Sequence, residues 1–196
     1  MKLVFATSNK GKLHEAASIL GPEYELLTPA DLGIFEDIPE TGSTLAENSL
    51  QKARYIHDRT GLDCFADDTG LEVDCLDGAP GIYSARYAGP GHDFDANIDK
   101  LLADMAAKGP DAPRTARFRC VVTLFWKGSL QRFDGLMEGL ITTERKGLRG
   151  FGYDPVFIPA EGDGQTLAEA EESYKNALSH RGKSLRALAD WLKENK

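Results

Sequence analysis

The sequence predicts an α/β fold from two patterns in particular. An apolar segment at residues 2–7, an amphipathic segment at 11–20 and a second apolar segment at 24–28 follow the strand–helix–strand order of a parallel α/β unit. Residues 116–126 and 130–137 have the pattern of a hairpin with its turn at Lys127-Gly128. Helical segments lie between these strands, so the chain alternates between the two periodicities.

Each predicted element has a local signal for its ends. Gly21-Pro22 stops the first helix, and residues 29–42 form an acidic loop. Thr44 and Glu47 fit a capping box, and Gly61 suits the end of the helix between them. The apolar residues expected on one face of that helix are Leu45, Ala46, Leu50, Ala53 and Ile56.

The rest of the chain is divided by turn residues. A strand at 62–66 is expected to end at Asp67-Asp68-Thr69-Gly70, and a separate short strand follows at 71–75. The further expected elements are a turn at 78–81, a helix at 93–108, a glycine-rich irregular segment at 147–164 and a last helix at about 183–193.

Composition restricts the class of protein. At 196 residues the chain suits one domain with, at most, two lobes. Its net charge of −8 disfavours a nucleic-acid polymer as partner, because phosphate backbones select basic surfaces. Three cysteines without CxxC spacing disfavour a disulfide framework or a cysteine zinc site. Since no apolar run is long enough for a membrane span and no signal peptide is evident, a cytoplasmic protein is expected.

The segment Thr7-Ser8-Asn9-Lys10-Gly11-Lys12 joins the first strand to the first helix. Backbone N–H groups at a helix N-terminus, together with hydroxyls and lysines, make a plausible phosphate cradle. The spacing is not that of a Walker A motif. Taken alone, the segment suits a polar strand-to-helix turn better than a phosphate site.

Asp67 and Asp68 are the second candidate. At the carboxyl end of a strand, where α/β sheets bind ligands, two acids suit a divalent cation or a general base. An acidic turn is the alternative. Glu40 and Glu47 could add a magnesium contact, although Glu47 better fits its capping role, and Lys52 either faces the phosphates or is a solvated surface charge.

Two later segments carry aromatic and basic groups. Phe151-Gly152-Tyr153-Asp154-Pro155 suits stacking against a base, with Asp154 as an acceptor, or else a loop anchored by buried aromatics. The stretch from Lys175 to Lys183 includes His180 and Arg181, which could donate to anionic or carbonyl oxygens. Its alternative is a basic helix start capped by Ser179.

Together these segments resemble the ITPase family of nucleoside-triphosphate pyrophosphatases, the Ham1-like or RdgB-like enzymes. The segments that carry the resemblance, in order, are TSNKGK at 7–12, ETGSTLAENSLQKA at 40–53, ADDTGLEVDCLDGAPGIYSARYAG at 66–89, GFGYDP at 150–155 and KNALSHRGKSL at 175–185. They span nearly the whole chain, which is therefore treated as a single ITPase-like domain over residues 1–196.

The resemblance implies an enzyme that hydrolyses 6-oxopurine nucleoside triphosphates, such as ITP, dITP and XTP, to the monophosphate and pyrophosphate. It also implies Mg²⁺ as cofactor, a homodimer, and a twisted mixed sheet flanked by helices, in two lobes with a central cleft. Asp68 is implied as proton acceptor and metal ligand, with Glu40 as a second metal ligand. The implied substrate contacts are Thr7, Ser8, Asn9, Lys10, Gly11, Lys12, Thr69, Phe151, Gly152, Tyr153, Asp154, Lys175, His180 and Arg181.

The chain departs from the family pattern at two places. Pro39 stands where another acid precedes the glutamate, and Leu167 and Ala170 replace apolar residues of a TFAEM element, which we interpret as local repacking. Two other functions compete with this reading. A Maf-like pyrophosphatase would act on pyrimidine or modified bases, and a silent nucleotide sensor would not need both Asp67 and Asp68. The segments at 151–154 and 179–181 favour the ITPase-like reading.

Overall fold

The computed structural model describes residues 1–195, with the side chains of Glu172 and Asn176 left out. Its strands form one six-stranded sheet in the order β2-β1-β3-β4-β5-β6. The strand bounds are β1 Lys2–Phe5, β2 Glu25–Leu27, β3 Cys64–Val73, β4 Thr115–Trp126, β5 Ser129–Ile141 and β6 Phe157–Pro159. β1 pairs in parallel with β2 and β3, whereas β5 and β6 are antiparallel, so the sheet is mixed and the predicted α/β class is confirmed.

The helices are α1 Lys10–Leu20, α2 Leu45–Thr60, α3 Phe94–Ala107, α4 Glu172–Leu178 and α5 His180–Glu194. The first three lie where the sequence predicts them. α5 begins before the predicted start at Lys183, and α4 and the short strand β6 were not predicted. Among residues 1–195, no helix is both long enough and apolar enough to cross a membrane.

The chain divides into two compact units. Unit 1 comprises Met1–Asp68, Cys120–Gly135 and Arg181–Lys196, and unit 2 comprises Thr69–Arg119 and Leu136–His180. Strands β3, β4 and β5 each contribute residues to both units. That the whole chain folds as one domain stays a prediction.

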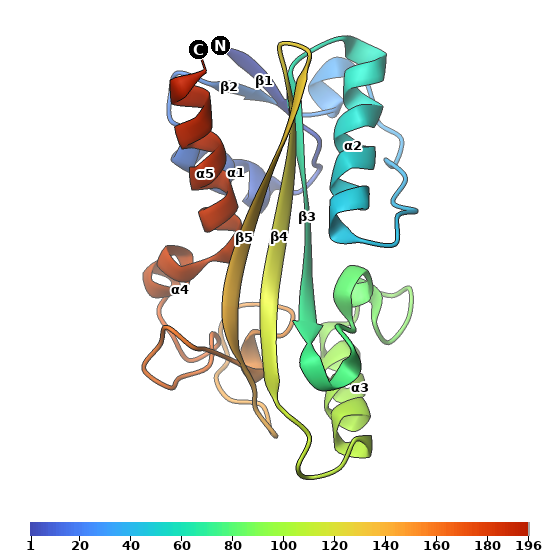
Figure 1. Cartoon of the computed structure of the whole chain (residues 1–196), viewed down its shortest axis with the longest axis vertical. Helices are drawn as coiled ribbons and strands as arrows, with labels where there is room; N and C mark the ends of the chain where they lie inside the picture. Colours follow the sequence, from blue (N-terminus) through green and yellow to red (C-terminus); the bar gives the residue numbers. More distant parts are fainter. Residues whose placement is uncertain (196) are drawn as a thin grey trace. The chain divides into compact units, whose positions relative to one another are not determined.

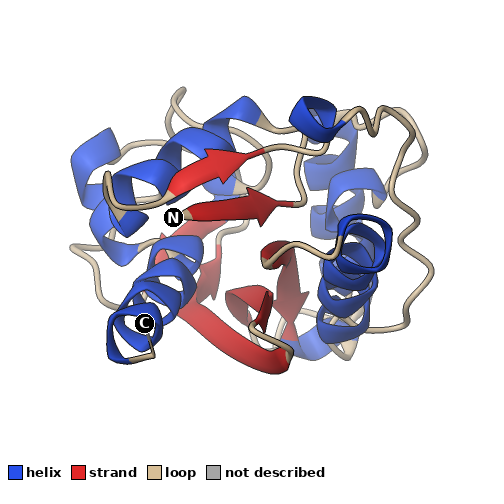
Figure 2. Cartoon of the chain, turned by 90° about the horizontal axis from the view of Figure 1, so that it is seen from above, coloured by secondary structure: helices blue, strands red, loops and turns tan. Residues whose placement is uncertain are grey.

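Unit 1 has helices on both faces of its strands. Figure 1 shows α2 along one side of these strands and α1 with α5 along the other. Viewed from above in Figure 2, β1 starts at the N label and lies beside its parallel partner β2. The buried rings of Phe5 and Phe65 stack at 4.3 Å and face α1 and α5, whereas Cys64 and Ala66 pack with Ala53 of α2. Neighbouring residues of β3 therefore face different helices.

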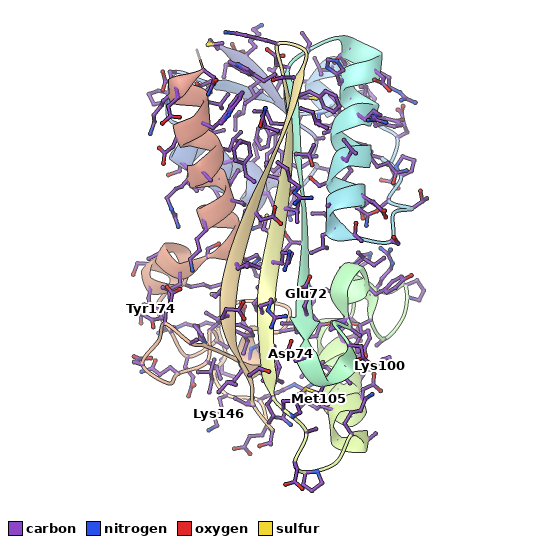
Figure 3. The ribbon with its side chains drawn as sticks, in the orientation of Figure 1. Glu72, Asp74, Lys100, Met105, Lys146 and Tyr174 are labelled. Atoms are coloured by element: carbon purple, nitrogen blue, oxygen red, sulfur yellow. The ribbon has the colours of Figure 1, made fainter. Side chains whose placement is uncertain are left out.

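Unit 2 keeps its apolar core on one face of β3. Leu71 and Val73 are fully buried in a core that includes Leu101 of α3. Glu72 and Asp74, labelled in Figure 3, instead lie 3.9 and 2.9 Å from the guanidinium nitrogens of Arg117 in β4. The alternation of side chains continues through this half of the strand.

The prediction of two strands separated by a loop at residues 67–70 was wrong. β3 runs without a break from Cys64 to Val73, so the two aspartates lie inside a strand. Asp and Gly are typical of turns, but pairing of β3 with its neighbour β4 overrides that local preference, since β1 pairs only with Cys64 and Phe65.

The predicted buried face of α2 was only partly right. Leu45, Ala53 and Ile56 are buried, but Ala46 and Leu50 are only partly so. The remaining buried positions are polar: Asn48, Ser49 and Lys52. Since a buried polar group needs a partner, these residues indicate that α2 covers a polar part of the sheet.

Candidate functional site

The alternation along β3 separates the two aspartates that the sequence places side by side. Asp67 faces α1 and α5, where Lys12 and Arg181 contact it, and Asp68 faces α2, where Lys52 contacts it. Because successive strand residues point to opposite faces, the two carboxylates make their ion pairs on opposite sides of β3. Each therefore belongs to its own cluster, and the expectation that they act as a pair stays a prediction.

The Asp67 cluster is a set of buried ion pairs. The Asp67 side chain is 2% exposed, and its Oδ2 lies 2.8 Å from Lys12 Nζ and 3.2 Å from Arg181 Nε. Cys120 Sγ lies 3.9 Å from the same oxygen. Burial by itself would raise the pKa of this carboxyl, but the Lys12 and Arg181 charges outweigh it and hold that pKa well below its usual range. Asp67 is therefore anionic at neutral pH, and a lowered pKa makes it a weaker base than a free aspartate.

In the Asp68 cluster, burial outweighs the charge of the basic partner, and the pKa of the carboxyl is raised. Lys52 Nζ lies 3.2 Å from Asp68 Oδ1 and 2.5 Å from Glu40 Oε1, so one ammonium joins two carboxylates. Burial raises the pKa of Asp68, the charge of Glu40 raises it further, and Lys52 opposes both. A carboxyl whose pKa is raised is a stronger base than a free aspartate.

Asp68 and Glu40 suit a divalent cation. Their oxygens already converge on one cationic nitrogen, and carboxylate oxygens are the ligands that Mg²⁺ prefers. In the part of the chain that the structure describes, no three His, Cys, Asp or Glu side chains gather at a possible metal site. Two protein carboxylates fit Mg²⁺, because this ion keeps several waters or substrate phosphates as its other ligands.

The segment from Thr7 to Lys12 leads from β1 into the first turn of α1, which begins at Lys10. Asn9 is the N-cap, and its Oδ1 accepts from the backbone N–H groups of Gly11 at 2.9 Å and Lys12 at 3.1 Å. Thr7 Oγ1 accepts from Asn9 N at 3.2 Å, and Ser8 and Lys10 are exposed. The helix cap thus already holds two of the backbone donors that the phosphate-cradle hypothesis uses.

The aromatic cluster lies in unit 2. The Phe151 ring is 62% exposed, and Lys175 Nζ lies 4.5 Å from its centroid. Tyr153 is instead 5% exposed, and its hydroxyl donates to Ser84 O at 2.8 Å. Phe151 is therefore the ring that can stack on a ligand, whereas Tyr153 anchors the loop from inside the core.

Asp154 closes the loop that presents Phe151. Its buried Oδ2 accepts from Phe151 N at 2.9 Å and pairs with Lys175. Gly150 has φ +77° and approaches this carboxylate so closely that a Cβ there would lie 2.2 Å from Oδ2. A glycine is required at this position for both reasons. Asp154 holds Phe151 and Lys175 in place, a role the sequence did not predict.

His180 and Arg181 are neighbours in the chain but belong to different units. The His180 ring stacks on Phe118 in unit 2, with centroids 5.1 Å apart and 14° between the planes. Arg181 NH1 lies 3.1 Å from Glu15 Oε2 in unit 1, in addition to its contact with Asp67. Thr69, half-buried on β3, is the first residue of unit 2.

Sequence reasoning left Lys52 undecided and missed Glu15. The signal for Lys52 was present: Asn48, Ser49 and Lys52 interrupt the apolar face of α2 at helical spacing. Glu47, left open as a metal ligand, accepts from Ser43 N at 2.6 Å and Ser43 Oγ at 2.7 Å, while Thr44 Oγ1 accepts from Glu47 N at 3.1 Å. Its role at the helix start is confirmed, and its carboxylate also binds Ser43, the residue before the N-cap Thr44.

Comparison with known proteins shows which family this chain is similar to. Residues 3–191 match the Ham1 family. A dITP/XTP pyrophosphatase of Christiangramia forsetii is 48% identical over 98% of this chain and 99% of its own length, and that of Porphyromonas gingivalis is 49% identical over 97% of each. The solved structure of the Staphylococcus aureus Ham1 protein superposes with a TM-score of 0.93 at 35% identity, over the full length of both chains.

Proposed function

The chain belongs to the Ham1 family, and from this premise we propose that it is a Mg²⁺-dependent pyrophosphatase of 6-oxopurine nucleoside triphosphates. Its substrates are ITP, dITP and XTP, and its products are the nucleoside monophosphate and pyrophosphate. Relatives that carry the name dITP/XTP pyrophosphatase support the substrate class. The observation in the structure that supports the chemistry is the convergence of Asp68 and Glu40 on Lys52 Nζ.

The first requirement of the reaction is charge neutralisation. A nucleoside triphosphate carries about four negative charges, which repel an attacking nucleophile until cations offset them. Bound Mg²⁺, held by Asp68 and Glu40, would supply most of that offset at the phosphates. Lys52 lies beside both carboxylates, and we assign it to the triphosphate, which can take the place of one carboxylate as its partner. Lys12 adds a second cation.

Asp68 acts as the general base. A water molecule attacks the α-phosphorus and forms a new P–O bond, the bond from that phosphorus to the α–β bridging oxygen breaks, and pyrophosphate leaves with the bond electrons. Asp68 accepts the proton that the water loses. A positioned base of this kind contributes about 10²–10⁴-fold to the rate.

The base of the nucleotide is assigned to the aromatic and donor groups. Phe151 offers the exposed ring on which a purine stacks, and Asp154 holds that ring in place. A purine with a 6-oxo group needs a donor, and we assign that donation to His180 and Arg181. Adenine presents an amino group there, which would leave two donors facing each other at a cost of about 1–3 kcal/mol per unpaired group.

A product assay with a panel of triphosphates tests the function. With MgCl₂ present, ITP, dITP and XTP are expected to give pyrophosphate and the monophosphate far faster than ATP or the pyrimidine triphosphates do. Excess EDTA is expected to stop the reaction. Orthophosphate and a nucleoside diphosphate as the first products would contradict attack at the α-phosphorus, and preference for a pyrimidine would contradict the substrate class.

The proposal extends to a cytoplasmic homodimer, an assembly that rests on family resemblance. Light scattering of the purified chain at micromolar concentration is expected to give about twice the monomer mass. A monomer mass across the same concentrations would contradict the assembly without touching the reaction.

A further inference from the structure

We propose that Asp67 is a positioning residue for catalysis: its carboxylate holds the Lys12 ammonium, and secondarily the Arg181 guanidinium, in the place where each meets the nucleotide. The inference deepens the proposed function and rests on it, since it concerns the same site. Asp67 itself is not placed on the substrate or the metal, because it lies on the face of β3 opposite Asp68.

The contacts of Asp67 connect three separate parts of unit 1. Lys12 is the third residue of α1, Arg181 is the second residue of α5, and Asp67 lies in the middle of β3. Lys12 Nζ is within 2.9 Å of both carboxylate oxygens, and Arg181 Nε is 3.2 Å from Oδ2. One buried anion therefore fixes the side chains that leave the first turns of two helices.

The charges in this cluster explain why an anion is needed there. Lys12 and Arg181 both contact the same carboxylate oxygen, so without Asp67 two like charges would face each other in a poorly hydrated place. The first turn of each helix also carries the positive end of its dipole. Arg181 keeps a second anion, Glu15, at 3.1 Å, whereas Asp67 is the one carboxylate partner of Lys12 among the side chains that the structure describes. Lys12 is therefore the cation whose place depends most on Asp67.

The consequence for catalysis concerns kcat rather than KM. Uncompensated cations still attract a polyanionic substrate, so loss of the Asp67 charge is not expected to weaken binding. Displacement of Lys12 by about 1 Å from its productive position is enough to cost about 10²-fold in rate. A charge-based role also has a distinctive order of variants: glutamate, which keeps the charge, should function better than asparagine, which keeps the shape.

The test compares Asp67→Asn and Asp67→Glu with the wild type, using kcat and KM per folded molecule well below each melting temperature. Asp67→Asn is expected to lower kcat about 10–100-fold with KM unchanged or lower, and Asp67→Glu to retain more of the wild-type kcat. Leu188→Ala, which opens a cavity in the core under α5, serves as a control that destabilises unit 1 without changing charge, and its kcat should stay within about 2-fold of wild type. An Asp67→Asn kcat equal to or above that of Asp67→Glu would overturn the proposal.

A double variant keeps the test decisive if Asp67→Asn fails to fold. Asp67→Asn combined with Lys12→Gln removes both members of the pair and leaves Arg181 its contact with Glu15. If Asp67 acts mainly through Lys12, the double variant should have a kcat within about 3-fold of Lys12→Gln alone; a further fall of 10-fold or more contradicts that route. The assays use whichever triphosphate of the panel the wild type hydrolyses. A wild type inactive on all of them contradicts the proposed function, whereas an active wild type with the wrong variant order contradicts the positioning role alone.

Discussion

The candidate site residues of the two units are held in place by different forces. In unit 1, Asp67 and Lys52 are buried and Asp68 is half-buried, and each is held by an opposite charge. In unit 2, the exposed Phe151 is held by the hydrogen bond of its backbone to Asp154. Removal of one buried charge leaves its partner uncompensated, whereas removal of an exposed ring takes away only contact area. Substitutions in unit 1 should therefore change both rate and stability, and those at Phe151 should change affinity.

The largest expected effect is that of Asp68→Asn. An amide cannot accept the proton of the attacking water and is a weaker metal ligand, so kcat for ITP should fall about 10³-fold or more, at the upper end of what a general base contributes. Circular dichroism and the melting temperature should show a folded protein. A variant with near wild-type kcat would show that Asp68 is not the general base. It would also contradict the expectation that substitutions in unit 1 change the rate.

Next comes the stability of Asp67→Asn. Breaking a buried ion pair costs about 3–5 kcal/mol, so the free energy of unfolding at pH 7 should fall by about that amount. The folded-state pKa of Asp67 lies below its unfolded value, so the stability it adds is present above about pH 4 and is lost as the pH falls toward the folded pKa. Urea unfolding of both proteins from pH 7 to pH 3 should show the difference shrinking with acid. A constant difference would mean that shape rather than charge stabilises this position.

The third effect concerns the selectivity for the base. Arg181→Ala should lower kcat/KM for ITP about 10-fold or more beyond its effect on ATP, since a hydrogen bond from a charged donor contributes about 1.5–3 kcal/mol. The matched control is Arg186→Ala, which removes an exposed arginine from the same helix. It should leave kcat/KM unchanged for both ITP and ATP. An equal fall for both nucleotides would assign Arg181 to its contacts with Asp67 and Glu15 rather than to the base.

The smallest effect is that of Phe151→Ala. Loss of a stacking ring costs about 1–3 kcal/mol per base, so KM for ITP should rise about 10-fold while the melting temperature stays close to that of the wild type. Leu148→Ala, at another exposed apolar residue of unit 2, is the control for lost surface area. A large fall in melting temperature with unchanged KM would place Phe151 among the structural residues and remove the difference between the two units.

The sequence by itself determined the fold class, the hairpin, helices α1, α2 and α3, most of α5, and the family. Each of these rests on local information: the capping box at Thr44, the stop at Gly21-Pro22, the turn at Lys127-Gly128, and apolar residues at strand or helix spacing. The short elements α4 and β6 carried too few residues for a period to show.

Only the tertiary structure decided which charged side chains contact one another. Local preference predicted a loop at residues 67–70. Strand pairing within the sheet instead makes these residues part of β3, so Asp67 and Asp68 point to opposite faces. The face that each helix covers then decides which carboxylate its basic residue contacts: Asp67 for Lys12 and Arg181, and Asp68 for Lys52. Such contacts join residues up to 166 positions apart, and no local pattern encodes them.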